Sequence, residues 1–312
     1  MPRQKLAAWE EFVEVPADET SQMKMGRMEC KHCKGTVSKS VHRLLSHLRT
    51  CPKYEGEVAA NDAPNDNVKD EGESAIQYHP LSKYIDHTLL KADATSDDII
   101  KLCEEAHANG FFSVCVNGIY ASFAREVLDG MYAPGQPRQG RRVKVCCVVG
   151  FPLGASASAV KAFEATQCLN DGAEEIDMVL AVGKMKSGDH AYVLRDICAV
   201  VAACKAQRAL CKVILETALL TEEEIRVASE LAVSAGANFI KTSTGFSTRG
   251  ASVDDVVAMS RIAHPKHVQV KASGGVRSLD DANKMIQAGA TRLGTSSGIA
   301  ITRGEVVQAG QY

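Results

Sequence analysis

Several features are scarce in this sequence of 312 residues. Aromatic side chains make up only 5% of it, with a single tryptophan. No apolar run approaches the roughly 18 residues that a membrane helix requires, and residues 1–12 lack the apolar core of a signal peptide. The 36 lysines and arginines nearly balance the 38 acidic residues. These absences exclude collagenous, wholly disordered and membrane-spanning classes, and we expect a cytoplasmic or nuclear protein.

The charges are unevenly distributed along the chain. Residues 24–53 carry eight lysines and arginines against one acid, whereas residues 55–73 carry seven acids against one lysine. The acidic stretch has little to bury and is typical of a linker. We therefore expect a small basic domain over 1–55, an acidic flexible linker over 56–80 and a main domain over 81–312. The eight cysteines of the main domain are scattered through apolar segments and are expected to be reduced core residues.

The main domain repeats one pattern, a short apolar run followed by an amphipathic stretch. The eight predicted strands are 84–88, 111–116, 143–151, 175–180, 212–217, 239–243, 268–273 and 291–296. Gly110, Gly172, Gly236 and Gly289 stand where the intervening helices should end. Strands that are apolar at most positions and alternate with helices predict an α/β fold, a (β/α)8 TIM barrel preceded by a small zinc-finger-like domain. An open, doubly wound sheet is the alternative.

Four charged residues interrupt the ends of these apolar strands: Asp177, Glu216, Lys241 and Lys271. A charge in an apolar wall costs several kcal/mol unless it is paired, so each of them could belong to a structural ion pair. The active site of such a barrel lies where the strands end. Two lysines at matching depth on consecutive strands would destabilise each other's protonated form, which predicts a neutral, nucleophilic amine that forms a Schiff base.

The loops after the last three strands are rich in glycine and hydroxyl side chains. They are residues 244–245, 274–275 and 294–298. Exposed backbone N–H groups and hydroxyls on neighbouring loops bind anions, and a phosphate site in the last loops is a recurring barrel feature. Each loop alone would be an ordinary turn, but together they predict a phosphate site.

Several motifs of the main domain occur in the order and spacing of a known family. They are IDHTLLK, VVGFPLG, EIDMV, KVILET, FIKTSTGF, VKASGGVR and GTSSG, and they run through residues 84–300. In these motifs the chain closely resembles the deoxyribose-phosphate aldolases, class I aldolases of the (β/α)8 type. The resemblance implies cleavage of 2-deoxy-D-ribose 5-phosphate to D-glyceraldehyde 3-phosphate and acetaldehyde, without a metal or other cofactor for catalysis.

The resemblance also implies roles for individual residues. Lys241 would form the Schiff base, Lys271 would depress its pKa and assist proton transfer, and Asp177 would be the acid/base partner acting through water. The residues implied to hold the 5-phosphate are Gly245, Gly274, Gly275, Ser296 and Ser297.

Three further residues have open roles. Asp86 is expected to orient its neighbours or a substrate hydroxyl, and Glu216 either pairs with a site lysine or positions water. Both are counted as substrate-binding candidates. Tyr312 ends the given sequence, and the family's terminal tyrosine can reach the site, but a frayed terminus is an equal alternative.

The basic segment carries its own pattern. Cys30 and Cys33 are separated by two residues, and His47 and Cys51 by three, which suits a tetrahedral structural zinc ion. The arrangement resembles a BED-type zinc finger, a module usually associated with DNA. The basic residues would fit a phosphate-contacting surface, or they form a solvated face. The alternative function for the chain is therefore a nucleic-acid-binding regulator that uses the barrel as a scaffold or metabolite sensor. A homo-oligomer is left open.

Overall fold

The computed structural model describes residues 12–15, 27–30, 36–38, 80–132 and 142–305. The chain divides into two compact units, Met1–Gln77 and Tyr78–Tyr312. In the first unit, β1 (Phe12–Val15), β2 (Arg27–Cys30) and β3 (Thr36–Ser38) form an antiparallel sheet in that order. Among the described residues, none of the helices combines the length and apolarity needed to cross a bilayer.

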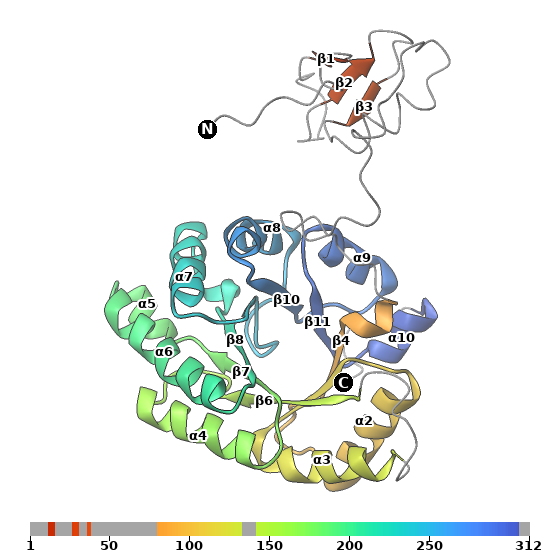
Figure 1. The fold of residues 1–312 in the computed structure, drawn as a ribbon, viewed down its shortest axis with the longest axis vertical. Coiled ribbons are helices and arrows are strands. Elements are labelled where there is room, and N and C mark those ends of the chain that lie inside the picture. Colours follow the sequence, from red (N-terminus) through yellow and green to blue (C-terminus); the bar gives the residue numbers. More distant parts are fainter. Residues whose placement is uncertain (1–11, 16–26, 31–35, 39–79, 133–141, 306–312) are drawn as a thin grey trace, which may run out of the picture. The chain divides into compact units, whose positions relative to one another are not determined.

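The second unit is a closed barrel of eight parallel strands, as the sequence predicts (Figure 1). Its strands are β4 (Ile85–Thr88), β5 (Ser113–Val116), β6 (Lys144–Val149), β7 (Glu175–Val179), β8 (Leu210–Ile214), β9 (Phe239–Lys241), β10 (Gln269–Ser273) and β11 (Arg292–Thr295). Each strand pairs with the next in the chain, and β11 pairs with β4 to close the barrel. Closure rules out the alternative of an open sheet.

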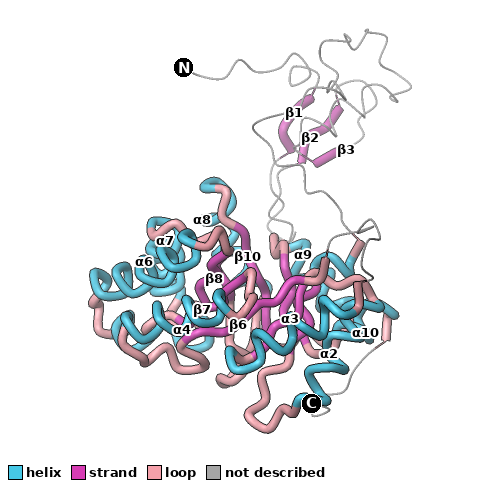
Figure 2. Tube along the Cα trace, turned by 60° about the horizontal axis from the view of Figure 1, so that its bottom comes forward, coloured by secondary structure: helices cyan, strands magenta, loops and turns pink. Residues whose placement is uncertain are grey.

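Helices surround the barrel on its outside (Figure 2). They are α2 (Ser96–Ala108), α3 (Ala121–Gly130), α4 (Ser158–Asn170), α5 (Val182–Lys186), α6 (His190–Ala206), α7 (Glu222–Ser234), α8 (Val253–Ala263), α9 (Leu279–Gln287) and α10 (Gly298–Arg303). Short 3-10 turns occur at η3 (Leu81–Tyr84), η4 (Gly118–Tyr120), η5 (Thr217–Leu219) and η6 (His264–Lys266).

The sequence signals at the helix ends are confirmed. Thr95 and Thr221 cap α2 and α7, each in a reciprocal hydrogen-bonded pair with the acid three residues later. The four predicted stop glycines all have positive φ, from 62° at Gly110 to 114° at Gly289, a conformation that favours glycine. These caps fix where each helix returns the chain to the barrel.

Two kinds of interior result from the alternation of side chains along the strands. One large apolar cluster joins strand residues such as Val114 and Ile176 to helix residues such as Ala165 and Ile197. The remaining positions face the barrel axis, where buried charges predominate, with a small apolar cluster of Leu90, Cys115, Cys146 and Val148 beside them. Such a charged interior is costly unless its members pair with one another, so these charges define the candidate site.

Candidate active site

Asp177 on β7 is the centre of the buried charges. Its Oδ2 atom accepts hydrogen bonds from both Lys241 and Lys271, each at 2.8 Å, and its Oδ1 atom accepts one from Lys212 at 2.8 Å. Lys241 and Lys271 are register partners on adjacent strands, as the sequence predicts. Their two amines therefore converge on one carboxylate oxygen.

Two more carboxylates and an arginine extend this network. Asp86 accepts from Lys271 at 2.5 Å and from Arg292 at 2.8 Å, and Glu175 accepts from Lys212 at 2.6 Å and from Arg292 at 3.1 Å. All these groups are buried. The network therefore sets four buried cationic side chains against three carboxylates, and the partly exposed Lys144 lies 3.8 Å from Glu175 at its edge.

The electrostatics of the network differ in one respect from the sequence-based expectation. Burial would raise the pKa of Asp177, but Lys212, Lys241 and Lys271 outweigh it and hold that pKa well below its usual range. Burial likewise opposes a charge on Lys271, but the carboxylates of Asp177 and Asp86 raise its pKa. The expectation that the two lysines mutually destabilise their protonated forms is therefore wrong for Lys271, because a shared carboxylate lies between the two amines.

A cavity of about 740 Å³ opens above this network. Lys241 lines it, although its side chain is only 3% exposed. All five predicted phosphate-binding residues line the same cavity, namely Gly245, Gly274, Gly275, Ser296 and Ser297. Lys271 and Asp177 are absent from the lining and lie buried behind Lys241. The predicted nucleophile and the predicted anion loops thus share one chamber.

The loop glycines have a structural reason to be glycine. Gly245, Gly274 and Gly275 have φ values of 89°, 79° and 80°, which other residues rarely adopt. A Cβ atom on Gly274 would lie 2.9 Å from the Cα atom of Gly250. The loops therefore approach one another closely, and all three glycines line the cavity.

The remaining two candidates lie apart from the cavity lining. Asp86 is buried in the network, where Ser113 also donates to it at 2.6 Å, so it orients Lys271 and Arg292. Glu216 has a left-handed backbone (φ 58°) and accepts from the backbone N–H of Thr244 at 3.3 Å and from its hydroxyl. Its placement holds the loop after Lys241.

Sequence reasoning missed several members of the site. Glu175 and Arg292 stand at the start of their strands, where a charge is unremarkable, and Lys212, the third residue of β8, stands at the start of the strand that the sequence predicts over 212–217. One available signal was the spacing of two residues between Glu175 and Asp177, which places both on the same strand face. The outer wall of the cavity was also missed; it includes Lys91, Asp98, Lys101 and Glu105, with His87 bonded to Glu105 at 2.8 Å.

The predicted zinc site and Tyr312 lie outside what the structure describes. Cys33, His47, Cys51 and Tyr312 are not among the described residues, and of Cys30 only the backbone, at the end of β2, is described.

The comparisons agree with this geometry. A barrel with a buried lysine beneath a glycine-rich cavity is an arrangement suited to a Schiff-base aldolase. Residues 81–304 match the model of the DeoC/LacD family aldolases. The chain belongs to this family and is thus an aldolase, a carbon–carbon lyase.

Within the aldolases, the chain is closely similar in sequence to enzymes named deoxyribose-phosphate aldolase. The chain is 53% identical over 225 residues to the deoxyribose-phosphate aldolase of Geobacillus sp., covering 72% of this chain and 96% of the relative. It is 52% identical over 225 residues to the same enzyme of Halalkalibacterium halodurans, with the same coverage. The solved tetrameric deoxyribose phosphate aldolase of Aeropyrum pernix is 34% identical with a TM-score of 0.65, covering 72% of this chain and 89% of that one.

Proposed function

We propose that this chain cleaves 2-deoxy-D-ribose 5-phosphate to D-glyceraldehyde 3-phosphate and acetaldehyde through a Schiff base on Lys241. The observation that carries the proposal is the placement of the Lys241 amine in the cavity, 2.8 Å from a carboxylate that it shares with Lys271. The relatives, which are named deoxyribose-phosphate aldolases, support the choice of substrate. They favour this function over a regulator with a barrel scaffold.

The charge balance of the network supports Lys241 as the nucleophile. Four cations face three carboxylates, and Lys212, Lys271 and Arg292 each bond two of these carboxylates. Lys241 bonds only Asp177 and alone among the four lines the cavity. Because one positive charge exceeds the carboxylates, loss of a proton from Lys241 to the cavity leaves every remaining cation paired. The resulting neutral amine can attack a carbonyl carbon.

The reaction then proceeds in steps that the network can support. The amine of Lys241 adds to the C1 aldehyde of the open-chain sugar phosphate, and loss of water gives an iminium ion. That cation accepts the electron pair of the C2–C3 bond once the C3 hydroxyl gives up its proton, and glyceraldehyde 3-phosphate departs. The remaining enamine is protonated at carbon, and hydrolysis releases acetaldehyde and restores Lys241.

Proton transfer in this scheme involves Lys271 and Asp177. Because the pKa of Asp177 is held low, its carboxylate remains an anion, which aligns the two lysines and orients a water molecule that carries the proton. Lys271, bonded to the same oxygen as Lys241, supplies the proton donor. General acid–base groups of this kind contribute about 10²–10⁴-fold in rate.

The phosphate of the substrate binds in the glycine-rich loops under this proposal. Gly245, Gly274 and Gly275 offer backbone N–H groups, and Ser296 and Ser297 offer hydroxyls, on one side of the cavity that Lys241 lines. Backbone nests of this kind bind anions. The two ends of the sugar phosphate are thereby fixed relative to the amine.

Trapping with borohydride tests the Schiff base directly. The full chain is incubated with acetaldehyde and reduced, and peptide mass spectrometry locates the adduct. We expect an ethyl adduct on Lys241. The unchanged chain should cleave the sugar phosphate without added metal, and Lys241→Leu should not. Lys184→Leu, an exposed lysine on α5, is the matched control. Retained cleavage in Lys241→Leu would refute the covalent mechanism.

For the N-terminal segment we propose a structural zinc ion held by Cys30, Cys33, His47 and Cys51, in a BED-type finger. The spacing of the ligands supports it, as does the antiparallel pairing of β2 and β3, since Cys30 ends one strand and Cys33 lies in the segment that joins the two. Cys33→Ser is expected to hold one zinc ion fewer per full chain than the unchanged protein, whereas Cys198→Ser keeps the full zinc content. Equal zinc content in both variants would contradict the assignment.

Contact with DNA and a homo-oligomeric state complete the proposal. The eight basic residues of 24–53 support salt-dependent binding to DNA, and binding to a duplex that does not weaken with salt would contradict it. The tetrameric relative from Aeropyrum pernix supports self-association, which light scattering on the full chain measures. We propose a cytoplasmic location, with a nuclear one following if the segment binds DNA.

A further inference from the structure

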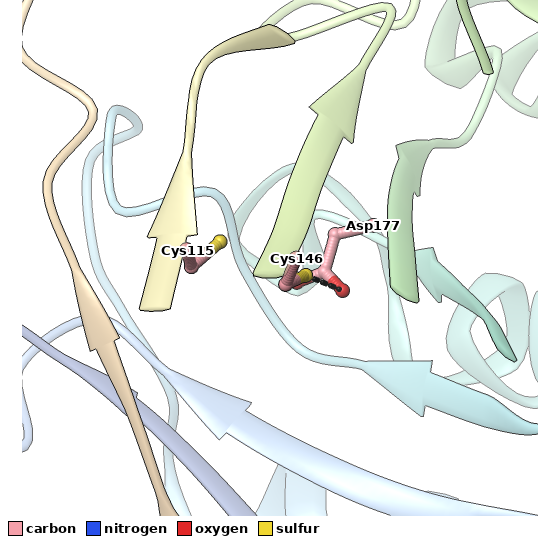
Figure 3. Close-up of side chains that lie close together, drawn as sticks. All are labelled: Cys115, Cys146 and Asp177. Atoms are coloured by element: carbon pink, nitrogen blue, oxygen red, sulfur yellow. Dashed lines mark hydrogen bonds between the residues drawn. The ribbon is translucent and has the colours of Figure 1, made fainter. Parts of the chain in front are cut away.

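We propose that Cys115, Cys146 and Asp177 form a binding site for a thiophilic divalent cation of the Zn²⁺ or Cd²⁺ kind. Figure 3 shows the three side chains together on β5, β6 and β7. The site differs from the zinc site proposed for the N-terminal segment. Metal binding by Cys115, Cys146 and Asp177 is independent of the proposed aldolase reaction, whereas the inhibition described below rests on that proposed function.

The geometry of the three side chains suits one ion. Their ligand atoms lie within 4.8 Å of one another, and Cys115 and Cys146 are register partners on adjacent strands. In a tetrahedral zinc site, with bonds of about 2.3 Å to sulfur and about 2.0 Å to oxygen, the ligand atoms are roughly 3.5–3.8 Å apart. The Sγ atom of Cys146 is 3.1 Å from Oδ1 of Asp177. Changes of side-chain torsion are thus enough to close the site.

The donor set selects the class of ion. Two thiols and one carboxylate are soft and borderline ligands, which favour zinc and its heavier relatives over magnesium or calcium. All three residues are buried, so a strongly hydrated ion would lose its water without enough oxygen ligands to replace it. The site therefore discriminates against the hard cations that are abundant in cells.

The charge of the network is unchanged by this binding. One divalent cation replaces the two thiol protons of Cys115 and Cys146, which leave as the thiolates form, so the total charge around Asp177 is the same before and after. Cys146 now donates its proton to Asp177, and the ion takes the place of that proton. Lys212, which contacts Cys146 at 3.3 Å, keeps its bond to Glu175 at 2.6 Å.

The cavity provides a route to the site. Leu90 lines the cavity and also packs in the small apolar cluster that contains both cysteines. Leu90 thus connects the cavity lining with this cluster, and rotation of its side chain would open a path for an ion. We therefore expect binding to native protein to be slow but not to require unfolding.

Occupation of the site would stop the aldolase reaction. The ion competes with Lys241 and Lys271 for the carboxylate that these two lysines share, so that carboxylate no longer aligns both amines. Inhibition by Zn²⁺ or Cd²⁺ that a chelator reverses is the expected consequence.

Cobalt(II) is the probe for binding, because thiolate ligands give it intense charge-transfer absorption. The full chain carries Cys30→Ser, Cys33→Ser and Cys51→Ser to silence the N-terminal cysteines, and a phosphine reductant excludes disulfides. We expect one Co²⁺ per chain with a thiolate band that is lost in Cys115→Ala and in Cys146→Ala. Cys147→Ala is the matched control, since the thiol of Cys147 is buried like the other two but forms a hydrogen bond with the free thiol of Cys168. No thiolate band, or a band unchanged in both variants, would overturn the site.

A second measurement separates the site from the aldolase proposal. Cd²⁺ should lower the cleavage rate at least tenfold in the same background and in Cys147→Ala, but not in Cys115→Ala, which lacks one ligand of the ion and keeps the hydrogen bonds that Cys146, Lys212, Lys241 and Lys271 donate to Asp177. Cobalt binding without inhibition by Cd²⁺ would overturn the inhibitory role alone. Cobalt binding by a metal-free protein that never cleaves the sugar phosphate would instead refute the proposed function and leave the site standing. Thermal melts confirm that each variant is folded.

Discussion

The shared carboxylate of Asp177 can be tested by removing its charge while keeping its shape. Asp177→Asn leaves Lys212, Lys241 and Lys271 without the anion to which each now donates at 2.8 Å. Removal of one partner from a buried ion pair costs about 3–5 kcal/mol, and a domain of this size loses about 2–4 °C in Tm per kcal/mol. We therefore expect a fall in Tm of roughly 6–20 °C, and a fall in kcat of about 10²–10⁴-fold.

A second buried ion pair supplies the control for this experiment. Asp196 and Lys161 join α6 to α4 at 2.6 Å, and both side chains are fully buried, outside the active site. Asp196→Asn should lose comparable stability but keep its kcat at a temperature where both variants are folded. Differential scanning calorimetry and a coupled assay for glyceraldehyde 3-phosphate measure the two quantities. Full activity in folded Asp177→Asn, or equal loss of kcat in both variants, would refute the role of the shared carboxylate.

Three further predictions concern the loops, the helices and pH. Gly274→Ala strains a φ of 79° and sets a Cβ atom 2.9 Å from Gly250, at a cost of about 1–3 kcal/mol; KM for the sugar phosphate should rise about tenfold or more, while trapping of acetaldehyde on the lysine persists. An unchanged KM in steady-state kinetics would argue against the phosphate loop. Thr221→Ala removes the cap of α7 and should cost about 0.5–2 kcal/mol in urea unfolding without affecting kcat, so a large loss of activity would show that the cap does more than stabilise the helix. Burial raises the pKa of Asp86, but Arg292, Lys271 and Lys212 outweigh it and lower that pKa, and the pKa of Asp177 is lowered as well. Both carboxylates therefore stabilise the fold at pH values above the unfolded-state pKa of about 3.9, and this contribution is lost as the pH falls further. The urea midpoint should decline below about pH 4, and a midpoint that rises on acidification would contradict the sign.

Much of the fold was predictable because each unit of the barrel carries its own local signals. The capping residues Thr95 and Thr221 and the stop glycines mark helix boundaries, and apolar runs mark the strands between them. The existence of eight such units then leaves few arrangements, since parallel strands need helices on their outer face. The sequence could not settle closure over an open sheet, which depends on the pairing of β11 with β4.

The site was predictable where a charge conflicts with its neighbours. Lys241, Lys271 and Asp177 stand out because they lie deep in apolar strands. Arg292 begins β11, and Lys212, although it is the third residue of β8, begins the strand predicted over 212–217, so neither charge conflicts with its neighbours in the sequence. The partners of these groups depend on register, which a single sequence does not specify. Thus the sequence indicates two lysines at one depth, but not the carboxylate that both share, and this carboxylate together with Asp86 raises the pKa of Lys271, contrary to the expectation from two like charges alone.

The cross-strand bonds of Asp86 have a consequence for how the protein is made. Asp86 belongs to the first strand of the barrel and its partner Arg292 to the last, 206 residues later. Until the last strand is added, Asp86 lacks the guanidinium of Arg292, and of its two cationic partners only Lys271, on β10, is present in the chain. A nascent or truncated chain without β11 therefore has a carboxylate at Asp86 that lacks its Arg292 partner. The ion pairs of the catalytic centre thus stabilise the barrel fully only once its last strand has closed it.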